Sequence, residues 1–221
     1  MIQPRGRSRA KSSQRLGLNR DRVISEALDL LDREGLERFS IRRLAERLGA
    51  TPMALYNHVD SKRALLQAIA ETVVSNVDYR PVRGSWQNVV AACFRTLRAA
   101  CLAHPGAVSL VESAEVLPAA VFRPMEITLS ALKGAGLGEK DAMRAYFLLS
   151  TFTLGQVSYQ IKGWSRGVDA ATAAGEGLIT PKTFPAVTHA AGHGHWNFDE
   201  AFEFGLAVIL AGLKNKVQRR P

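Results

Sequence analysis

The side chains best suited to chemistry lie between Ser40 and Arg63, in the stretch SIRRLAERLGATPMALYNHVDSKR. Tyr56, Asn57 and His58 follow one another, and Lys62 comes four residues after His58. An asparagine amide can pair with N6 and N7 of adenine, and a lysine ammonium neutralises a phosphate. These residue types at this spacing indicate a surface that binds DNA.

Two short helices joined by a tight turn would position these side chains. Ser40 is a suitable N-cap for the first helix, and Gly49 can adopt the left-handed conformation that ends it. Thr51 and Pro52 then predict the cap and first residue of a second helix that runs to His58. The first helix has one apolar stripe at i, i+3, i+4 and i+7, formed by Ile41, Leu44, Ala45 and Leu48. The pattern is a helix-turn-helix, although an ordinary helical hairpin without a ligand shares it.

Helices are also predicted on both sides of this motif. Before it, an apolar face extends from Val23 to Leu31, with Asn19 as N-cap and Gly35 after the last turn. After it, Ser61 caps a helix over residues 62–77. Three helices and a connector make a unit of the size of a small DNA-binding domain.

The combined pattern over residues 19–66 resembles the tetracycline-repressor (TetR-like) family of transcriptional regulators. The resemblance is carried by Val23, Ile24, Ala27, Leu28, Leu31, Gly35, Ser40 to Ala45, Leu48, Gly49, Leu55, Tyr56, His58, Val59, Lys62, Leu65 and Leu66. A weaker likeness to the tetracycline-repressor subgroup continues at Ser85-Trp86-Gln87, at Phe152 to Gly155 and from Phe202 to Leu213, with residues 163–195 as a gap. It implies an all-α protein: a helix-turn-helix domain followed by a helical effector-binding and dimerisation domain.

The resemblance also assigns roles in DNA binding. It implies base or phosphate contact for Arg42, Thr51, Pro52, Met53, Ala54 and Asn57, and contact with the DNA backbone for Tyr56, His58 and Lys62. Asn57 departs from the bulky aromatic residue common at its position, and we expect it to read a base. Tyr56 can also seal the domain as a half-buried aromatic, and His58 can simply pack or cap.

Charge is concentrated at the N-terminus. Of the net charge of +9, residues 1–63 carry +6 and the remaining 158 residues carry +3. We expect residues 1–18 to be a flexible basic arm whose Arg5, Arg7 and Arg9 contact phosphates or the minor groove. A solubilising tail without a DNA contact is the alternative.

Residues 80–221 are expected to form the ligand-binding and dimerisation domain, after a connecting helix that ends near residue 79. Helices are predicted over 86–104, 118–133, 139–162 and 197–217, with a short segment between Pro105 and Pro118. The last two long helices are apolar on most sides, which predicts burial on more than one face. Pairing with the same two helices of a second copy would give the homodimer that the resemblance implies, and a dimer suits two half-sites on one duplex.

An effector cavity is implied by the resemblance rather than by the residues, since apolar stripes are more often core. Its expected lining is Cys93, Leu97, Val111, Thr128, Phe147, Thr151, Gln156 and Tyr159. In the tetracycline repressor, the positions that match Val111, Thr151 and Tyr159 carry the histidines and carboxylate around a magnesium ion. None of these three is a good Mg²⁺ ligand. We therefore expect a mostly apolar organic effector, not a magnesium–tetracycline chelate, and no cofactor.

Two other groups of residues, a cysteine–histidine pair and a histidine cluster, are weaker candidates for a catalytic or metal site. Cys101 and His104 lie at i, i+3 and could form a thiol–imidazole pair, but no third group orients them and core thiols explain the cysteines better. Residues 163–195 read as a loop and a lid, in which His189, His193 and His195 match no tight metal motif. We predict no catalytic or metal site.

Composition bounds the class of protein. The chain has 221 residues, 47% of them hydrophobic, no apolar run long enough to span a bilayer, and no secretory signal. Its two cysteines fit a reduced, cytoplasmic protein. The favoured function is a ligand-responsive repressor released from a pseudo-palindromic operator; the alternatives are an enzyme and a sequence-tolerant architectural DNA-binding protein without an effector. The sequence does not reveal the identity of the effector, the sequence of the operator, or whether the protein activates or represses transcription.

Overall fold

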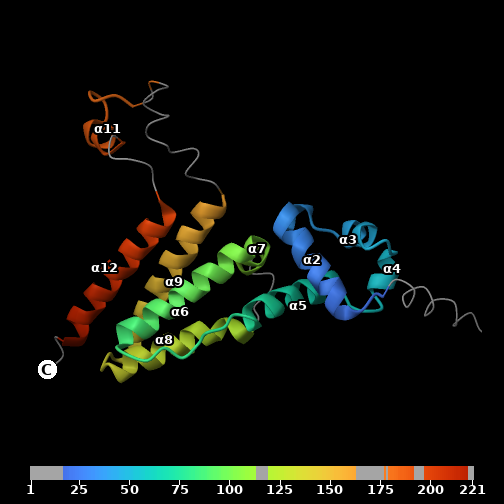
Figure 1. The fold of residues 1–221 in the computed structure, drawn as a ribbon, viewed down its shortest axis with the longest axis horizontal. Helices are drawn as coiled ribbons and strands as arrows, with labels where there is room; N and C mark the ends of the chain where they lie inside the picture. The colour runs from blue at the N-terminus through green and yellow to red at the C-terminus, as the bar shows by residue number, and fades with distance from the viewer. Residues whose placement is uncertain (1–16, 113–118, 163–176, 178, 192–196, 219–221) are drawn as a thin grey trace, which may run out of the picture. The chain divides into compact units, whose positions relative to one another are not determined.

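A computed structural model describes residues 17–112, 119–162, 177, 179–191 and 197–218. The secondary-structure elements of the described residues are all helices, as Figure 1 shows. They divide into two compact units, one made of residues up to 78 together with 99–123, and the other of residues 79–98 together with 124 onward. Helix α6 (Trp86–Ala103) belongs to both, since its residues up to Arg98 lie in the second unit and the rest in the first.

The first unit begins with the three predicted helices and their connector. Its elements are α2 (Arg20–Glu34), the 3-10 turn η1 (Leu36–Arg38), α3 (Ile41–Arg47), α4 (Pro52–Leu55) and α5 (Lys62–Ser75). The four expected N-caps all form, because the side chains of Asn19, Ser40, Thr51 and Ser61 each accept a hydrogen bond from a backbone N–H of the first turn. Gly49 ends α3 with a φ of 62°.

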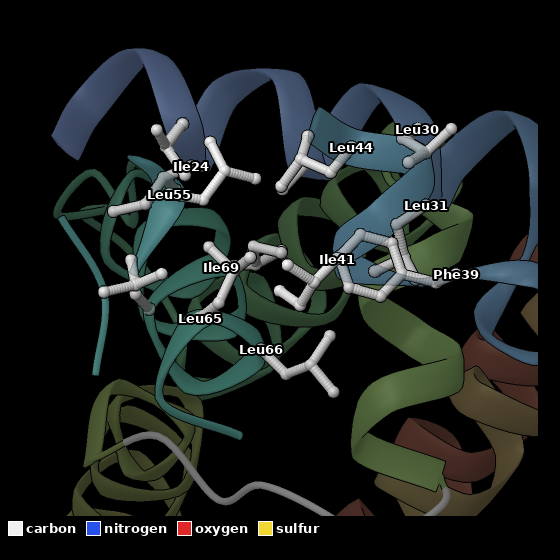
Figure 2. Packing of buried hydrophobic residues seen from close by; sticks show 14 of the residues in the cluster. Ile24, Leu30, Leu31, Phe39, Ile41, Leu44, Leu55, Leu65, Leu66 and Ile69 are labelled. Atoms are coloured by element: carbon white, nitrogen blue, oxygen red, sulfur yellow. The ribbon is translucent and has the colours of Figure 1, made fainter. Parts of the chain in front are cut away.

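The predicted apolar faces meet in one core. Leu44 from α3, Leu55 from α4 and Leu65 from α5 are completely buried. Figure 2 shows them converging with Ile24 and Ile69, so that all four helices contribute to the same cluster. This packing fixes the angle between α3 and α4 and thereby positions every side chain that α4 exposes.

The second predicted helix of the motif is shorter than expected. We predicted helix from Pro52 to His58, but α4 ends at Leu55. The hydrogen bonds tighten there, since the N–H groups of Asn57 and His58 donate to carbonyls three residues back, at Ala54 and Leu55. Residues 56–58 are therefore a turn that follows the helix.

Helix α7 (Pro105–Glu112) completes the first unit. Leu110 is completely buried within the core that α2, α3, α4 and α5 form. The carboxylate of Asp32, on α2, accepts a hydrogen bond of 2.8 Å from the N–H of Gly106 and lies 3.0 Å from Nδ1 of His104. The start of α7 is thus attached to α2 both by polar contacts and by packing.

The second unit is built from α6, α8 (Phe122–Gly134), α9 (Glu139–Ile161) and α12 (Phe198–Gln218), of which α8 is preceded by the 3-10 turn η2 (Ala119–Val121). Figure 1 shows α9 and α12 side by side. Aromatic rings join these helices: Phe94 lies 6.3 Å from Tyr146, and Phe152 stacks on Phe202 at 5.6 Å. Within the described residues, no helix is long and apolar enough to cross a membrane.

One expectation for the second unit is wrong. Residues 163–195 were expected to be a loop throughout, but Pro185–Ala191 form the short helix α11. Pro185 supplies the backbone φ of a first helical residue, and the N–H of Thr188 donates to Phe184 O at 2.9 Å. Seven residues are too few for apolar periodicity to reveal a helix. Most of the rest of that segment lies outside the described residues.

Gly106 gives a test of how tightly α7 packs on α2. A Cβ at this position would lie 2.7 Å from the carbonyl carbon of Leu31, which is backbone and cannot move aside. We expect Gly106→Ala to cost about 1–3 kcal/mol and to lower the melting temperature by several degrees. The control is Gly134→Ala, where nothing lies within 4 Å. Equal melting temperatures for the two variants would contradict the close packing.

Candidate nucleic-acid interface and effector-binding body

The residues predicted to read DNA form an exposed edge around α4. Met53 is 56% exposed and Tyr56 43% exposed, and Pro52 and Asn57 are exposed beside them. Ala54 is half-buried, and Thr51 is occupied as the cap, its Oγ1 accepting from Ala54 N at 3.2 Å. The completely buried side chain of Leu55 attaches this edge to the core of the first unit. The edge therefore offers an amide, a phenol and apolar groups to a ligand without opening the core.

Arg42 and Lys62 lie at the starts of α3 and α5. Both side chains are exposed, and the Arg42 guanidinium donates to Glu46 Oε1 at 3.0 Å on the same helix. The Lys62 ammonium lies 5.8 Å from the centre of the buried Phe39 ring. Exposed ion pairs contribute little to folding stability, so Arg42 can exchange Glu46 for a phosphate at small cost.

His58 differs from the other predicted DNA contacts. Its side chain is half-buried, and its Nε2 atom is buried without a hydrogen-bond partner among the described residues. That nitrogen cannot contact a phosphate in this packing. Half-burial suits the packing role expected for His58, and its contact with the DNA backbone stays a prediction.

Two arginines that we did not single out hold α3 on α2. Arg43 pairs with Glu34 at 2.8 Å, and Arg47 pairs with Glu26 at 2.9 Å and also with Asp29. The hydrogen bond to Glu26 is the main reason that the pKa of Arg47 is raised. Since both arginines are engaged within the domain, they orient α3 while Arg42 remains turned outward.

In the second unit, Cys93 and Thr128 are buried together. Cys93 Sγ lies 3.8 Å from Pro124 O, and Thr128 Oγ1 donates to the same carbonyl at 2.8 Å. Burial raises the pKa of the Cys93 thiol to about 11, with a smaller opposing effect from Thr128. Leu97, one turn further along α6, is half-buried. These three residues belong to the interior of one protomer.

The predicted effector residues on α9 lie elsewhere. Phe147 is 56% exposed, Tyr159 is 50% exposed and Thr151 is exposed, while Gln156 is half-buried. The buried face of α9 is formed instead by Ala142, Ala145, Tyr146, Leu149, Thr153 and Val157. Val111 is in α7, in the other unit, and its side chain is not described. The exposed residues Phe147, Thr151 and Tyr159 thus lie outside the buried face of α9, and their contact with an effector stays a prediction.

The remaining predicted sites fall partly outside the described residues. Arg5, Arg7 and Arg9 lie there, as do His193 and His195, while His189 is an exposed residue of α11. Among the described residues, no group of three or more His, Cys, Asp or Glu side chains could hold a metal ion.

Comparison with known proteins agrees with this geometry. Residues 23–69 match the family profile "Bacterial regulatory proteins, tetR family", and residues 80–217 match "Tetracyclin repressor-like, C-terminal domain". The chain belongs to the tetracycline-repressor family. It is 35% identical over 207 residues to the tetracycline repressor protein class C of Escherichia coli, covering 89% of this chain and 91% of that protein.

Solved structures of Streptomyces coelicolor proteins have the same fold. A protein of strain A3(2) described as a possible TetR family transcriptional regulator superposes with a TM-score of 0.77 at 30% identity, covering 89% of this chain and 99% of that one. The protein ActR in complex with actinorhodin gives a TM-score of 0.71 at 30% identity, with 90% and 98% covered. These relatives are regulators and not enzymes. The chain is a transcriptional regulator of this family.

The burial of Cys93 gives a chemical prediction. With a pKa of about 11, roughly 0.1% of this thiol is ionised at pH 8, against about a quarter for an unperturbed thiol near 8.5. We expect iodoacetamide to alkylate Cys93 at least a hundredfold more slowly in the folded protein than in the denatured chain, with a rate that still rises between pH 8 and 9.5. Peptide mass spectrometry gives the rate, and Cys93→Ser identifies the peptide. A rate that levels off by pH 9 would contradict the raised pKa.

Proposed function

We propose that this regulator is a repressor that reads a pseudo-palindromic operator through the edge formed by Pro52, Met53, Tyr56 and Asn57. The observation that carries the proposal is the exposure of these side chains in α4, whose only buried residue is Leu55, and in the turn that directly follows it. Asn57 would pair with a base, preferably adenine, and Met53 would contact a thymine methyl. Arg42, Tyr56 and Lys62 would contact the DNA backbone, with the arm residues Arg5, Arg7 and Arg9 adding contacts to phosphates or the minor groove.

A dimer would present two such edges to two half-sites. Helices α9 and α12 expose several large apolar side chains: Met143, Phe147, Leu148, Tyr159, Ile161, Phe204 and Val208. Phe204, at 74% exposed, is the most exposed of them. Exposed apolar surface on two neighbouring helices is typical of an interface. We propose that the same pair from a second copy covers it, giving a four-helix interface.

The effector would act through the second unit. A relative, ActR, has been crystallised with actinorhodin, and a TetR protein of Acinetobacter baumannii with minocycline. We propose a mostly apolar organic molecule here, in contact with Cys93, Leu97 and Thr128 inside the protomer and with α9 residues near the dimer face. Thr151 and Tyr159 offer hydroxyl groups and no carboxylate, which does not suit a magnesium chelate.

Release from DNA would follow from differential affinity. An effector that binds better to the dimer conformation whose edges miss the half-sites must weaken operator binding by the same factor. The regulator would act in the cytoplasm and without catalytic activity. An architectural DNA-binding protein would instead coat DNA with little sequence preference.

Footprinting of the purified protein on the DNA upstream of its own coding sequence, at near-physiological salt, separates these functions. A short protected pseudo-palindrome is expected for the repressor. Diffuse protection that disappears with modest salt would support the architectural alternative.

The base-reading role of Asn57 predicts a loss of specificity. We expect Asn57→Ala to weaken binding to the footprinted operator by about tenfold to a hundredfold, equivalent to 1–3 kcal/mol, and to leave non-specific binding unchanged. Fluorescence anisotropy with operator and scrambled duplexes measures both affinities. Lys140→Ala, an exposed change on α9, is the control. An equal loss on both duplexes would show a phosphate contact instead.

The proposed interface predicts that a charge in its centre prevents pairing. We expect Phe204→Glu combined with Val208→Glu to give a monomer that binds the full operator at least tenfold more weakly, because two carboxylates would be buried without partners. Light scattering gives the mass, and circular dichroism checks the helices. Phe122→Glu, on a different helix and 52% exposed, is the control and should leave the dimer intact. A dimeric double variant would place the interface elsewhere.

A further inference from the structure

Arg98 is a charged side chain in the interior of the second unit. Only 12% of it is exposed. Its Nη2 donates to Gln160 on α9 at 2.7 Å and to Asp199 at the start of α12 at 2.6 Å, and its guanidinium lies 4.8 Å from the centre of the Phe202 ring. Arg98 thus joins α6 to both helices of the proposed dimer face.

The hydrogen bonds of Arg98 are incomplete. Its Nε is buried and has no hydrogen-bond partner among the described residues. A buried donor without an acceptor costs about 1–3 kcal/mol, and more when the donor is charged. Its counter-ion Asp199 is close, but the Asp199 side chain is 74% exposed, so water screens the attraction between the two charges.

Arg95 on the same helix shows what a purely structural arginine looks like in this unit. It also pairs with α12, but its Nε and Nη2 donate to the two carboxylate oxygens of Glu203 at 2.7 and 2.5 Å. Its side chain is 55% exposed. Arg95 makes a bidentate, solvent-exposed ion pair, whereas Arg98 is buried and has one N–H donor without an acceptor among the described residues. A structural link between α6 and α12 therefore does not by itself explain why Arg98 is buried.

A second polar group lies unpaired on the helix that Arg98 contacts. Thr153 of α9 is completely buried, and its Oγ1 has no partner among the described residues. Thr128 shows the usual solution in a helix, a bond to the carbonyl four residues back. Thr153 and Gln160 are seven residues apart and therefore share one face of α9. Both unsatisfied groups can bond to an acceptor oxygen.

We infer that Arg98 binds an acidic or strongly accepting oxygen of the effector, such as a carboxylate, sulfonate or phenolate, with Thr153 as an auxiliary donor. The inference rests on the proposed function and narrows it: the effector is an apolar molecule with one anionic group. One carboxylate oxygen can accept a hydrogen bond from the Nε–H of Arg98 and the other can accept one from Nη2. Hydrogen bonds between charged groups are stronger than those between neutral groups. The effector would compete with Asp199 for the guanidinium of Arg98, and the displaced Asp199 carboxylate would then be hydrated by solvent.

Two fluorescent probes that differ only in the anionic group test this. They are 1-anilinonaphthalene-8-sulfonate and its uncharged parent, N-phenyl-1-naphthylamine. Dissociation constants are measured by titration of the full-length protein, the variant Arg98→Gln and the matched control Arg95→Gln, with melting temperature and operator binding recorded for each. We expect the sulfonate to bind the wild type about tenfold or more tightly than the parent. Arg98→Gln should remove that preference, and Arg95→Gln should keep it.

A second variant keeps the test informative if Arg98→Gln does not fold. Asp199→Asn removes the competing carboxylate and leaves Arg98 in place, so it should strengthen binding of the sulfonate several-fold and leave the uncharged parent unchanged. If Asp199 only holds the helices together, this variant would weaken both probes alike.

The outcomes separate the inference from the function on which it rests. Equal affinity of the two probes for the wild type, equal effects of the two arginine variants, or no saturable binding of either probe would overturn the role of Arg98. If the wild type bound operator and scrambled DNA equally well, the proposed repressor function would be wrong, whatever the probes showed. The expected pattern, with operator binding intact in Arg98→Gln, supports both.

Discussion

The carboxylate of Asp32 is the contact on which the arrangement of the first unit depends. One of its oxygens accepts from the backbone of Gly106 and the other meets the ring of His104, so a single side chain of α2 holds the turn between α6 and α7. Leu110 can then enter the core of the DNA-binding helices. Helix α6, which ends directly before His104, begins in the second unit, so the chain enters this contact from there.

Local signals made much of the fold predictable. Helix starts could be predicted, because an N-cap needs only a side-chain oxygen and the N–H groups of the next turn. This holds for Asn19, Ser40, Thr51 and Ser61. These starts and the apolar stripes between them predicted individual helices, whereas the family and the all-α architecture were predicted from the resemblance over residues 19–66. Helix ends were harder: α4 stops three residues early because its last hydrogen bonds tighten, and nothing in the residue types of Tyr56 to His58 requires that.

Contacts between residues distant in sequence were not predictable. Asp32 and His104 are 72 positions apart, and Arg98 meets Asp199 across 101. No periodicity encodes such pairs, since they arise only when helices pack. The same limit affected the predicted effector lining. It was carried over position by position, and the packing of α9 then turned Phe147, Thr151 and Tyr159 outward while Thr153 turned inward. Which of these residues meet an effector remains a prediction.

The separation of exposed and buried residues in and around α4 has a consequence for how such regulators diverge. Pro52, Met53 and Asn57 are exposed and take no part in the core, whereas Leu55 and Ala45 have almost no freedom to change. Substitutions at the three exposed positions can therefore accumulate with little loss of stability, since surface changes typically alter it by less than about 0.5 kcal/mol. On the proposed base contacts, substitutions at these three positions would change the preferred operator while the fold stays the same.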